Sequence, residues 1–173
     1  MKGRLLRNVG IFPKWTRSQF GPLEIQLNLK PGEIGTSQPL VSVGNRPFGA
    51  MLVLDCLSQS SVRLKWIQYS GAAVSSEPID WTYEEPHTLE FSVGSLLPPL
   101  QSSVWGPGIT PKEREEAKQL LRCVLDGREV WRTPVSAPDV YPSTVRVGQN
   151  GLTLSKIADA LNGDIISTKR IEW

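Results

Sequence analysis

The strongest candidate for ligand chemistry is a tryptophan in a predicted hairpin. Asp126-Gly127 is a dipeptide favoured in two-residue β-turns, so residues 120–132 are predicted to form two paired strands. Pairing outward from this turn places Arg122 opposite Trp131 and puts Glu129 on the same face. An indole beside charged hydrogen-bonding groups suits the apolar face of a sugar ring or a protein hot spot. A cross-strand cation–π pair between Trp131 and Arg122 explains the same pattern without a ligand and is the more common arrangement.

Three further aromatic residues fall in predicted loops. Trp81, Tyr83 and Trp105 lie outside the strand patterns, and loops on a rigid scaffold often carry recognition. The same side chains could instead close the ends of a β-sandwich, and the sequence does not separate these two interpretations. Trp66 differs, because it continues a buried alternation and is predicted to be core. The candidate ligand-binding residues are therefore Trp131, Arg122, Glu129, Trp81, Tyr83 and Trp105.

Catalysis has little support in the side chains present. His87 is the only histidine, and no Gly-x-Ser-x-Gly elbow precedes a helix, so a nucleophilic triad is not predicted. His87 begins a strand and is expected to be a hydrogen-bonded residue at a sheet edge. Asp80, Glu84 and Glu85 are close in sequence but not at strand spacing, which favours a solvated loop. No motif for a metal ion or a phosphate is present, so no cofactor is expected.

Composition and charge exclude several classes of protein. The formal net charge is only +2 and no block of five like charges occurs, so nucleic-acid binding is not expected. The apolar runs are too short for membrane insertion, and the charged N-terminal residues lack the apolar segment of a signal peptide. Two cysteines, Cys56 and Cys123, cannot form a disulfide framework. Both lie on predicted inward faces, where free thiols are the default and a bridge requires adjacent strands in an oxidising compartment.

The elements that carry these residues are mostly short strands. Alternation of apolar and polar residues recurs along the chain, with turn signals between the segments. One short helix is predicted over 111–119, because Thr110, Pro111 and Glu113 form a typical helix start, and a helical turn is expected within 155–161. About eight to ten strands without regularly alternating helices favour an antiparallel two-sheet β-sandwich. The predicted strands cover 23–29, 39–44, 50–57, 61–69, 88–93, both arms of 120–132, 144–148 and 164–171.

The order of these segments resembles the concanavalin A-like jelly roll, specifically laminin G-like domains. The likeness covers roughly residues 23–170 and is strongest in the Asp126-Gly127 hairpin and the strand led by His87. The sequence departs from the family pattern at Leu161, where an aromatic residue is usual, and by an insertion over 100–119. The stretches that carry the resemblance are 39–44, 87–93, 125–130, 145–150 and 161–165.

The resemblance implies a protein that binds glycans or proteins, or a hydrolase. Glucanases of this superfold carry their carboxylates in a Glu-x-Asp-x-x-Glu strand, and this sequence lacks that spacing. Some laminin G-like domains hold calcium, for which Asp55, Asp139 and Asp164 are available. No spacing singles these three out, so a structural calcium ion stays an open question.

These observations predict a single non-catalytic binding module over residues 1–173, expected to be part of a larger bacterial envelope or secreted protein. Its ligand would be a glycan or a protein surface, and neighbouring domains of the parent chain are further expected partners. A purely structural interaction domain is the alternative, and a diverged glycoside hydrolase or lyase is less favoured. The family resemblance also implies an extracytoplasmic location.

Overall fold

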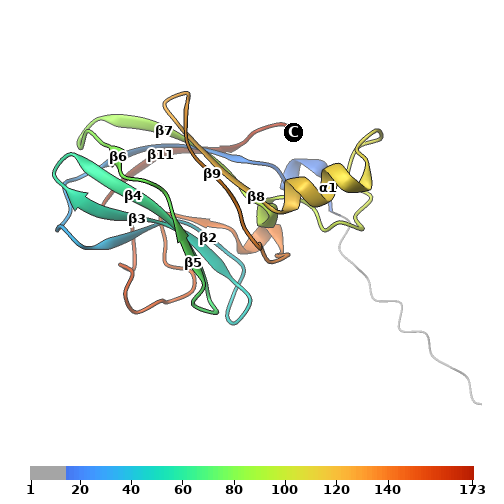
Figure 1. The fold of residues 1–173 in the computed structure, drawn as a ribbon, viewed down its shortest axis with the longest axis horizontal. Coiled ribbons are helices and arrows are strands. Elements are labelled where there is room, and N and C mark those ends of the chain that lie inside the picture. The colour runs from blue at the N-terminus through green and yellow to red at the C-terminus, as the bar shows by residue number, and fades with distance from the viewer. Residues whose placement is uncertain (1–14) are drawn as a thin grey trace, which may run out of the picture.

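A computed structural model describes residues 15–173, which form two antiparallel β-sheets packed face to face (Figure 1). The predicted β-sandwich is therefore confirmed, and the charged N-terminal residues considered above lie outside the described residues. Within residues 15–173 no helix is long and apolar enough to cross a membrane. The strands are β1 (Leu23–Leu29), β2 (Ser37–Val43), β3 (Ala50–Ser58), β4 (Ser61–Gln68), β5 (Ala73–Ser75), β6 (Ile79–Asp80), β7 (Pro86–Ser92), β8 (Leu120–Leu125), β9 (Arg128–Pro134), β10 (Arg146–Val147) and β11 (Gly163–Arg170).

The two sheets differ in how their strands are ordered. One sheet runs β11-β1-β7-β8-β9, and the other runs β10-β2-β3-β4-β5 with β6 paired to β4. The short strands β5 and β6 have too few residues to show an alternation and were not predicted. The strand expected over 144–148 is reduced to β10, because a 3-10 turn, η3 (Pro142–Thr144), precedes it.

Alternate residues of both sheets form the core, as the sequence pattern predicts. Trp66 of β4 is 1% exposed, and its ring lies 5.8 Å from that of Phe91 in the opposite sheet. Strand β3 departs from the simple pattern because both of its faces are buried. Its residues Met51 and Val53 pack under Leu152 and Ile157, which belong to the segment between β10 and β11. That segment therefore covers part of the outer face of the second sheet.

Both cysteines are buried and unbridged, as the default prediction states. Cys56 lies in β3 and Cys123 in β8, on inward faces of different sheets. Burial raises the pKa of the Cys123 thiol, so this group stays protonated at neutral pH.

Helix α1 (Pro111–Lys118) begins as predicted. The Thr110 hydroxyl accepts a bond from the Glu113 amide at 3.3 Å, and the Glu113 carboxylate accepts one from the Thr110 amide at 2.7 Å. The helical turn expected within 155–161 is wrong. The Asn150 side chain accepts a bond from the Leu154 amide and donates to the Ile157 carbonyl, which holds this stretch in tight turns.

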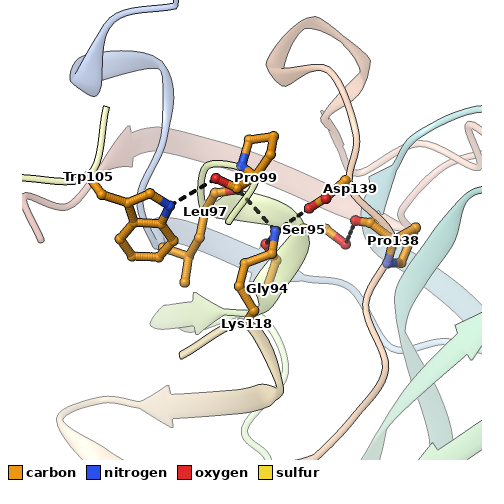
Figure 2. A network of polar contacts seen from close by, with 8 residues as sticks. All are labelled: Gly94, Ser95, Leu97, Pro99, Trp105, Lys118, Pro138 and Asp139. Carbon is orange, nitrogen blue, oxygen red and sulfur yellow. Dashed lines mark hydrogen bonds and ion pairs between the residues drawn. The ribbon is translucent and has the colours of Figure 1, made fainter. Parts of the chain in front are cut away.

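The last residue of α1 ties the inserted segment to the sandwich (Figure 2). Lys118 Nζ donates to the carbonyl of Gly94 at 2.6 Å and to that of Leu97 at 3.4 Å, and it pairs with Asp139. A side chain at Gly94, in the 3-10 turn η2 (Gly94–Leu96), would collide with the Lys118 carbonyl group. The insertion is therefore a packed part of the domain rather than a loose loop.

Candidate functional site

The Asp126-Gly127 hairpin forms as predicted, but its register does not follow simple pairing. Asp126 and Gly127 have φ of 49° and 80°, as a type I′ turn requires. Glu129 then pairs with Val124, but the next pair is Trp131 with Cys123, so Val130 is an extra residue on β9. This β-bulge reverses the predicted side of the sheet for the residues that follow it.

Trp131 therefore points into the core and not onto the outer face with Arg122. It is 8% exposed and belongs to the same hydrophobic cluster as Cys123. The predicted shared face of Trp131, Arg122 and Glu129 is wrong, and so is the cross-strand pairing of Trp131 with Arg122. The physical reason is that burying a large indole stabilises the fold more than regular pairing of one extra residue.

Arg122 and Glu129 do share the outer face, without an aromatic residue between them. Arg122 Nε lies 2.6 Å from Glu129 Oε2, and Arg132 Nη1 lies 3.8 Å from the same oxygen. Arg132 rather than Trp131 stands opposite Arg122. These side chains are partly exposed, so the group is a surface ion-pair network.

The loop aromatics lie at opposite ends of the sandwich. Trp81 and Tyr83 lie just before β7, and Trp105 lies in the insertion beside α1 (Figure 1). Trp81 and Trp105 are each 5% exposed, and Trp105 Nε1 donates to the Pro99 carbonyl at 2.9 Å (Figure 2). Burial, together with the nearby Cys56 thiol, raises the pKa of Tyr83 to about 12. Most of the surface of these side chains is therefore buried, and they close the ends of the sandwich.

Trp81 also lines a hollow at its end of the sandwich, which we call the Trp81 hollow. Its volume is about 490 Å³. The walls come from the β3–β4 turn, the segment from β6 to β7, and the tip of the β8–β9 hairpin, three parts that are distant in sequence. The lining residues are Ser60, Asp80, Trp81, Thr82, His87, Leu125, Asp126 and Arg128.

His87 holds two walls of the Trp81 hollow together. Its Nδ1 lies 2.7 Å from Asp126 Oδ2, and its Nε2 lies 2.8 Å from the Thr82 carbonyl oxygen. Both partners accept hydrogen bonds, so only a ring protonated on both nitrogens donates to both. The Trp81 ring lies 4.3 Å from the imidazole, at an angle of 45°. His87 is hydrogen-bonded as expected, but β7 lies between β1 and β8 and is not a sheet edge.

Asp126 is held as a carboxylate. Its Oδ1 accepts the Thr88 amide at 2.8 Å while Oδ2 faces His87. Burial acts to raise the pKa of Asp126, but the Thr88 amide and the His87 ring together lower it below its ordinary value. Within residues 15–173 no group of three or more His, Cys, Asp or Glu side chains is arranged to hold a metal ion.

The sequence identified Trp81 in this hollow but not the residues around it. Asp126 was predicted only as a turn residue, and no sequence pattern placed Ser60 or Arg128 at a site. The pairing of β7 with β8 is what brings Asp126 to His87 and Thr88, and that pairing has no local sequence signal.

No family model and no curated protein sequence matches this chain. Among solved structures it is similar to the CBM40 domain of the Ruminococcus gnavus IT-sialidase bound to α2,3-sialyllactose. The identity is 12%, the TM-score is 0.50, and the match covers 87% of this chain and 74% of that chain. A further structure of the CBM40 domain of the same sialidase matches with a TM-score of 0.50 and 12% identity, and the match covers 91% of this chain and 79% of that chain.

A second similar structure is that of domains LG4-5 of the mouse laminin α1 chain. Here the identity is 12%, the TM-score 0.46, and the coverage 87% of this chain and 40% of that chain. At the identity of the CBM40 matches, the comparison establishes the jelly-roll β-sandwich fold and nothing finer.

Proposed function

We propose that this chain is a non-catalytic carbohydrate-binding module whose ligand occupies the Trp81 hollow. The observation that carries the proposal is the convergence of the largely buried Trp81 indole with exposed hydrogen-bonding side chains in one hollow of a rigid β-framework. Sugar sites combine these two features, because the ring has an apolar face and a rim of hydroxyl groups.

Two side chains of the hollow are free to bind a ligand. Asp80 and Arg128 are exposed, and neither forms an ion pair with another of residues 15–173. Asp80 accepts and Arg128 donates, so together they match the mixed character of sugar hydroxyls. The His87–Asp126 contact holds the hairpin tip against the floor of the hollow, which reduces the ordering that binding requires.

The chemistry of Asp126 supports binding rather than hydrolysis. A glycosidase needs one carboxylic acid with a raised pKa to protonate the leaving oxygen. In the Trp81 hollow the pKa of Asp126 is lowered, and both of its oxygens are already hydrogen-bonded. Asp126 is therefore suited to a structural or hydrogen-bonding role.

The fold neighbours support a glycan as ligand. The CBM40 domain of similar fold is described with α2,3-sialyllactose bound, which is the reason for preferring a glycan to a protein surface. We further propose that this chain is part of a larger extracytoplasmic protein. Fractionation of cells that express the tagged parent protein tests this location.

The test is a glycan array followed by calorimetry with the best ligand. Asp80→Asn and Arg128→Gln should each weaken binding about 10- to 100-fold, since each removes a charged hydrogen-bonding partner. Arg132→Gln is the matched control, because Arg132 is an exposed arginine of the same strand β9 outside the hollow. Its affinity should stay within about twofold of the parent chain.

Three results would each overturn part of the proposal. Absence of binding to every glycan refutes the carbohydrate ligand, and equal losses in Arg128→Gln and Arg132→Gln refute the site. Release of reducing sugar from the bound glycan, abolished by Asp80→Asn, refutes the non-catalytic assignment.

A further inference from the structure

A second hollow lies at the other end of the sandwich, and it differs in charge from the Trp81 hollow. Its volume is about 560 Å³, and it lies between the 3-10 turn η1 (Arg17–Gln19) and the residues that follow β11. The register of β1 places the two hollows apart, because Leu23 pairs with Arg170 at one end and Asn28 pairs with Pro86 at the other. We call it the Arg170 hollow; its lining includes Arg17, Ser18, Phe20, Arg170, Glu172 and Trp173.

The aromatic wall of the Arg170 hollow is firmly held. The Ile171 amide donates to the Pro22 carbonyl at 2.8 Å, which continues the β1–β11 ladder to the edge of the hollow. The Trp173 ring then meets Trp105 edge to face at 5.0 Å. A side chain at Gly21 would collide with the Trp173 ring, so the indole lies directly on the backbone there.

Two guanidinium groups line this hollow, and each donates to a main-chain oxygen rather than to an Asp or Glu side chain. Arg17 lies 5.2 Å from the centre of the Trp173 ring and donates to the Trp173 main-chain oxygen. Arg170 Nη1 donates to the Gly21 carbonyl at 2.7 Å. Among residues 15–173 neither arginine forms an ion pair with an Asp or Glu side chain, although Glu172 lines the same hollow. Residues 1–14 contain no Asp or Glu that could supply one.

The position of Arg170 makes the lack of a carboxylate side chain beside it costly, although Nη1 donates to the Gly21 carbonyl. It stands opposite Leu23, whose side chain is in the core, so Arg170 lies on the inward side of the sheet and is half-buried. Burial lowers the pKa of its guanidinium, which reflects the same desolvation cost. A buried charge is usually paired, and pairing by an anion would offset that cost. An inward arginine can also protect a sheet edge, but that role needs neither a second arginine nor an aromatic wall.

We propose that the Arg170 hollow binds a carboxylate-bearing sugar of the hexuronate class. The carboxylate would lie between Arg17 and Arg170, since a planar guanidinium binds carboxylate through two parallel hydrogen bonds. The sugar ring would lie on the Trp173 side of the hollow. This site does not depend on the Trp81 hollow, so each site can fail without the other.

The test uses the full chain and titrations followed by NMR and calorimetry, with glucuronate and galacturonate as ligands and with glucose and galactose as neutral controls. Either uronate should bind at least about 10-fold more tightly than its neutral counterpart. Arg17→Gln and Arg170→Gln should each reduce uronate affinity about 10-fold or more, and added salt should weaken binding. Arg128→Gln, in the Trp81 hollow, should leave uronate affinity unchanged.

Arg17→Gln keeps the test decisive if Arg170→Gln lowers stability, because Arg17 is exposed and outside the sheets. Equal affinity for uronate and neutral sugar overturns the proposal. Unchanged uronate affinity in both Arg17→Gln and a folded Arg170→Gln also overturns it. Equal binding of inorganic sulfate also overturns it, since the hollow would then recognise charge without a sugar. If uronate binds only after residues 1–14 are removed, those residues and not a sugar would be the natural occupant of the Arg170 hollow, which would also overturn the proposal.

Discussion

Replacing Lys118 with methionine should destabilise the domain through the backbone carbonyls that its ammonium group satisfies. The Lys118 side chain is 9% exposed, and Nζ donates to the Gly94 carbonyl at 2.6 Å and the Leu97 carbonyl at 3.4 Å. Methionine keeps the apolar stem, so packing changes little, but both carbonyls lose their donor. A hydrogen bond from a charged donor contributes about 1.5–3 kcal/mol, and the longer contact adds little.

The ion pair with Asp139 contributes less than these carbonyl contacts. The Asp139 side chain is 55% exposed and regains water when its partner is removed. We therefore expect Lys118→Met to lower the free energy of unfolding by about 2–3 kcal/mol. At this chain length that corresponds to a fall in melting temperature of roughly 4–12 °C.

Urea unfolding followed by tryptophan fluorescence and circular dichroism measures this loss. Lys112→Met is the matched control on the same helix, because the Lys112 side chain is 85% exposed and should change stability by less than about 0.5 kcal/mol. Asp139→Asn should cost less than Lys118→Met, because the amide oxygen of asparagine can still accept a hydrogen bond from Lys118 Nζ. The reasoning is refuted if Lys118→Met behaves like Lys112→Met, or if Asp139→Asn costs as much as Lys118→Met.

Three further outcomes follow from burial and hydrogen bonding. Trp131→Ala should cost about 3–5 kcal/mol in urea unfolding, whereas Tyr141→Ala, at a 59% exposed position, should cost less than about 1 kcal/mol; similar small costs would place Trp131 at the surface. Because the pKa of Asp126 is lower in the folded chain, its contribution to stability is present above about pH 4 and is lost as the pH falls through the folded value. Asp126→Asn should therefore lessen the loss of stability in acid, and an unchanged pH profile would argue against the contacts of Asp126 described here. The Cys123 thiol should react with a thiol reagent only after unfolding, because it is 0% exposed and its pKa is raised; rapid labelling of folded Cys123, read by mass spectrometry, would contradict this.

Local patterns predicted most of the elements correctly. The alternation in β4, the start of α1 at Thr110 and the Asp126-Gly127 turn all appear in the structure. Each depends on residues a few positions apart, because strand faces, helix caps and tight turns are formed by neighbours in the chain. Local patterns were therefore sufficient to predict two stacked antiparallel sheets.

The side on which Trp131 lies was decided by contacts with distant strands. A bulge at Val130 costs one regular pair and gains a buried indole, and no nearby residue signals that balance. The same holds for the two hollows, whose charged groups come from segments distant in sequence that only the folded chain brings together. Alternation along one strand depends on the period of the backbone, whereas register and burial depend on the free energy of packing whole sheets, which only the folded chain determines.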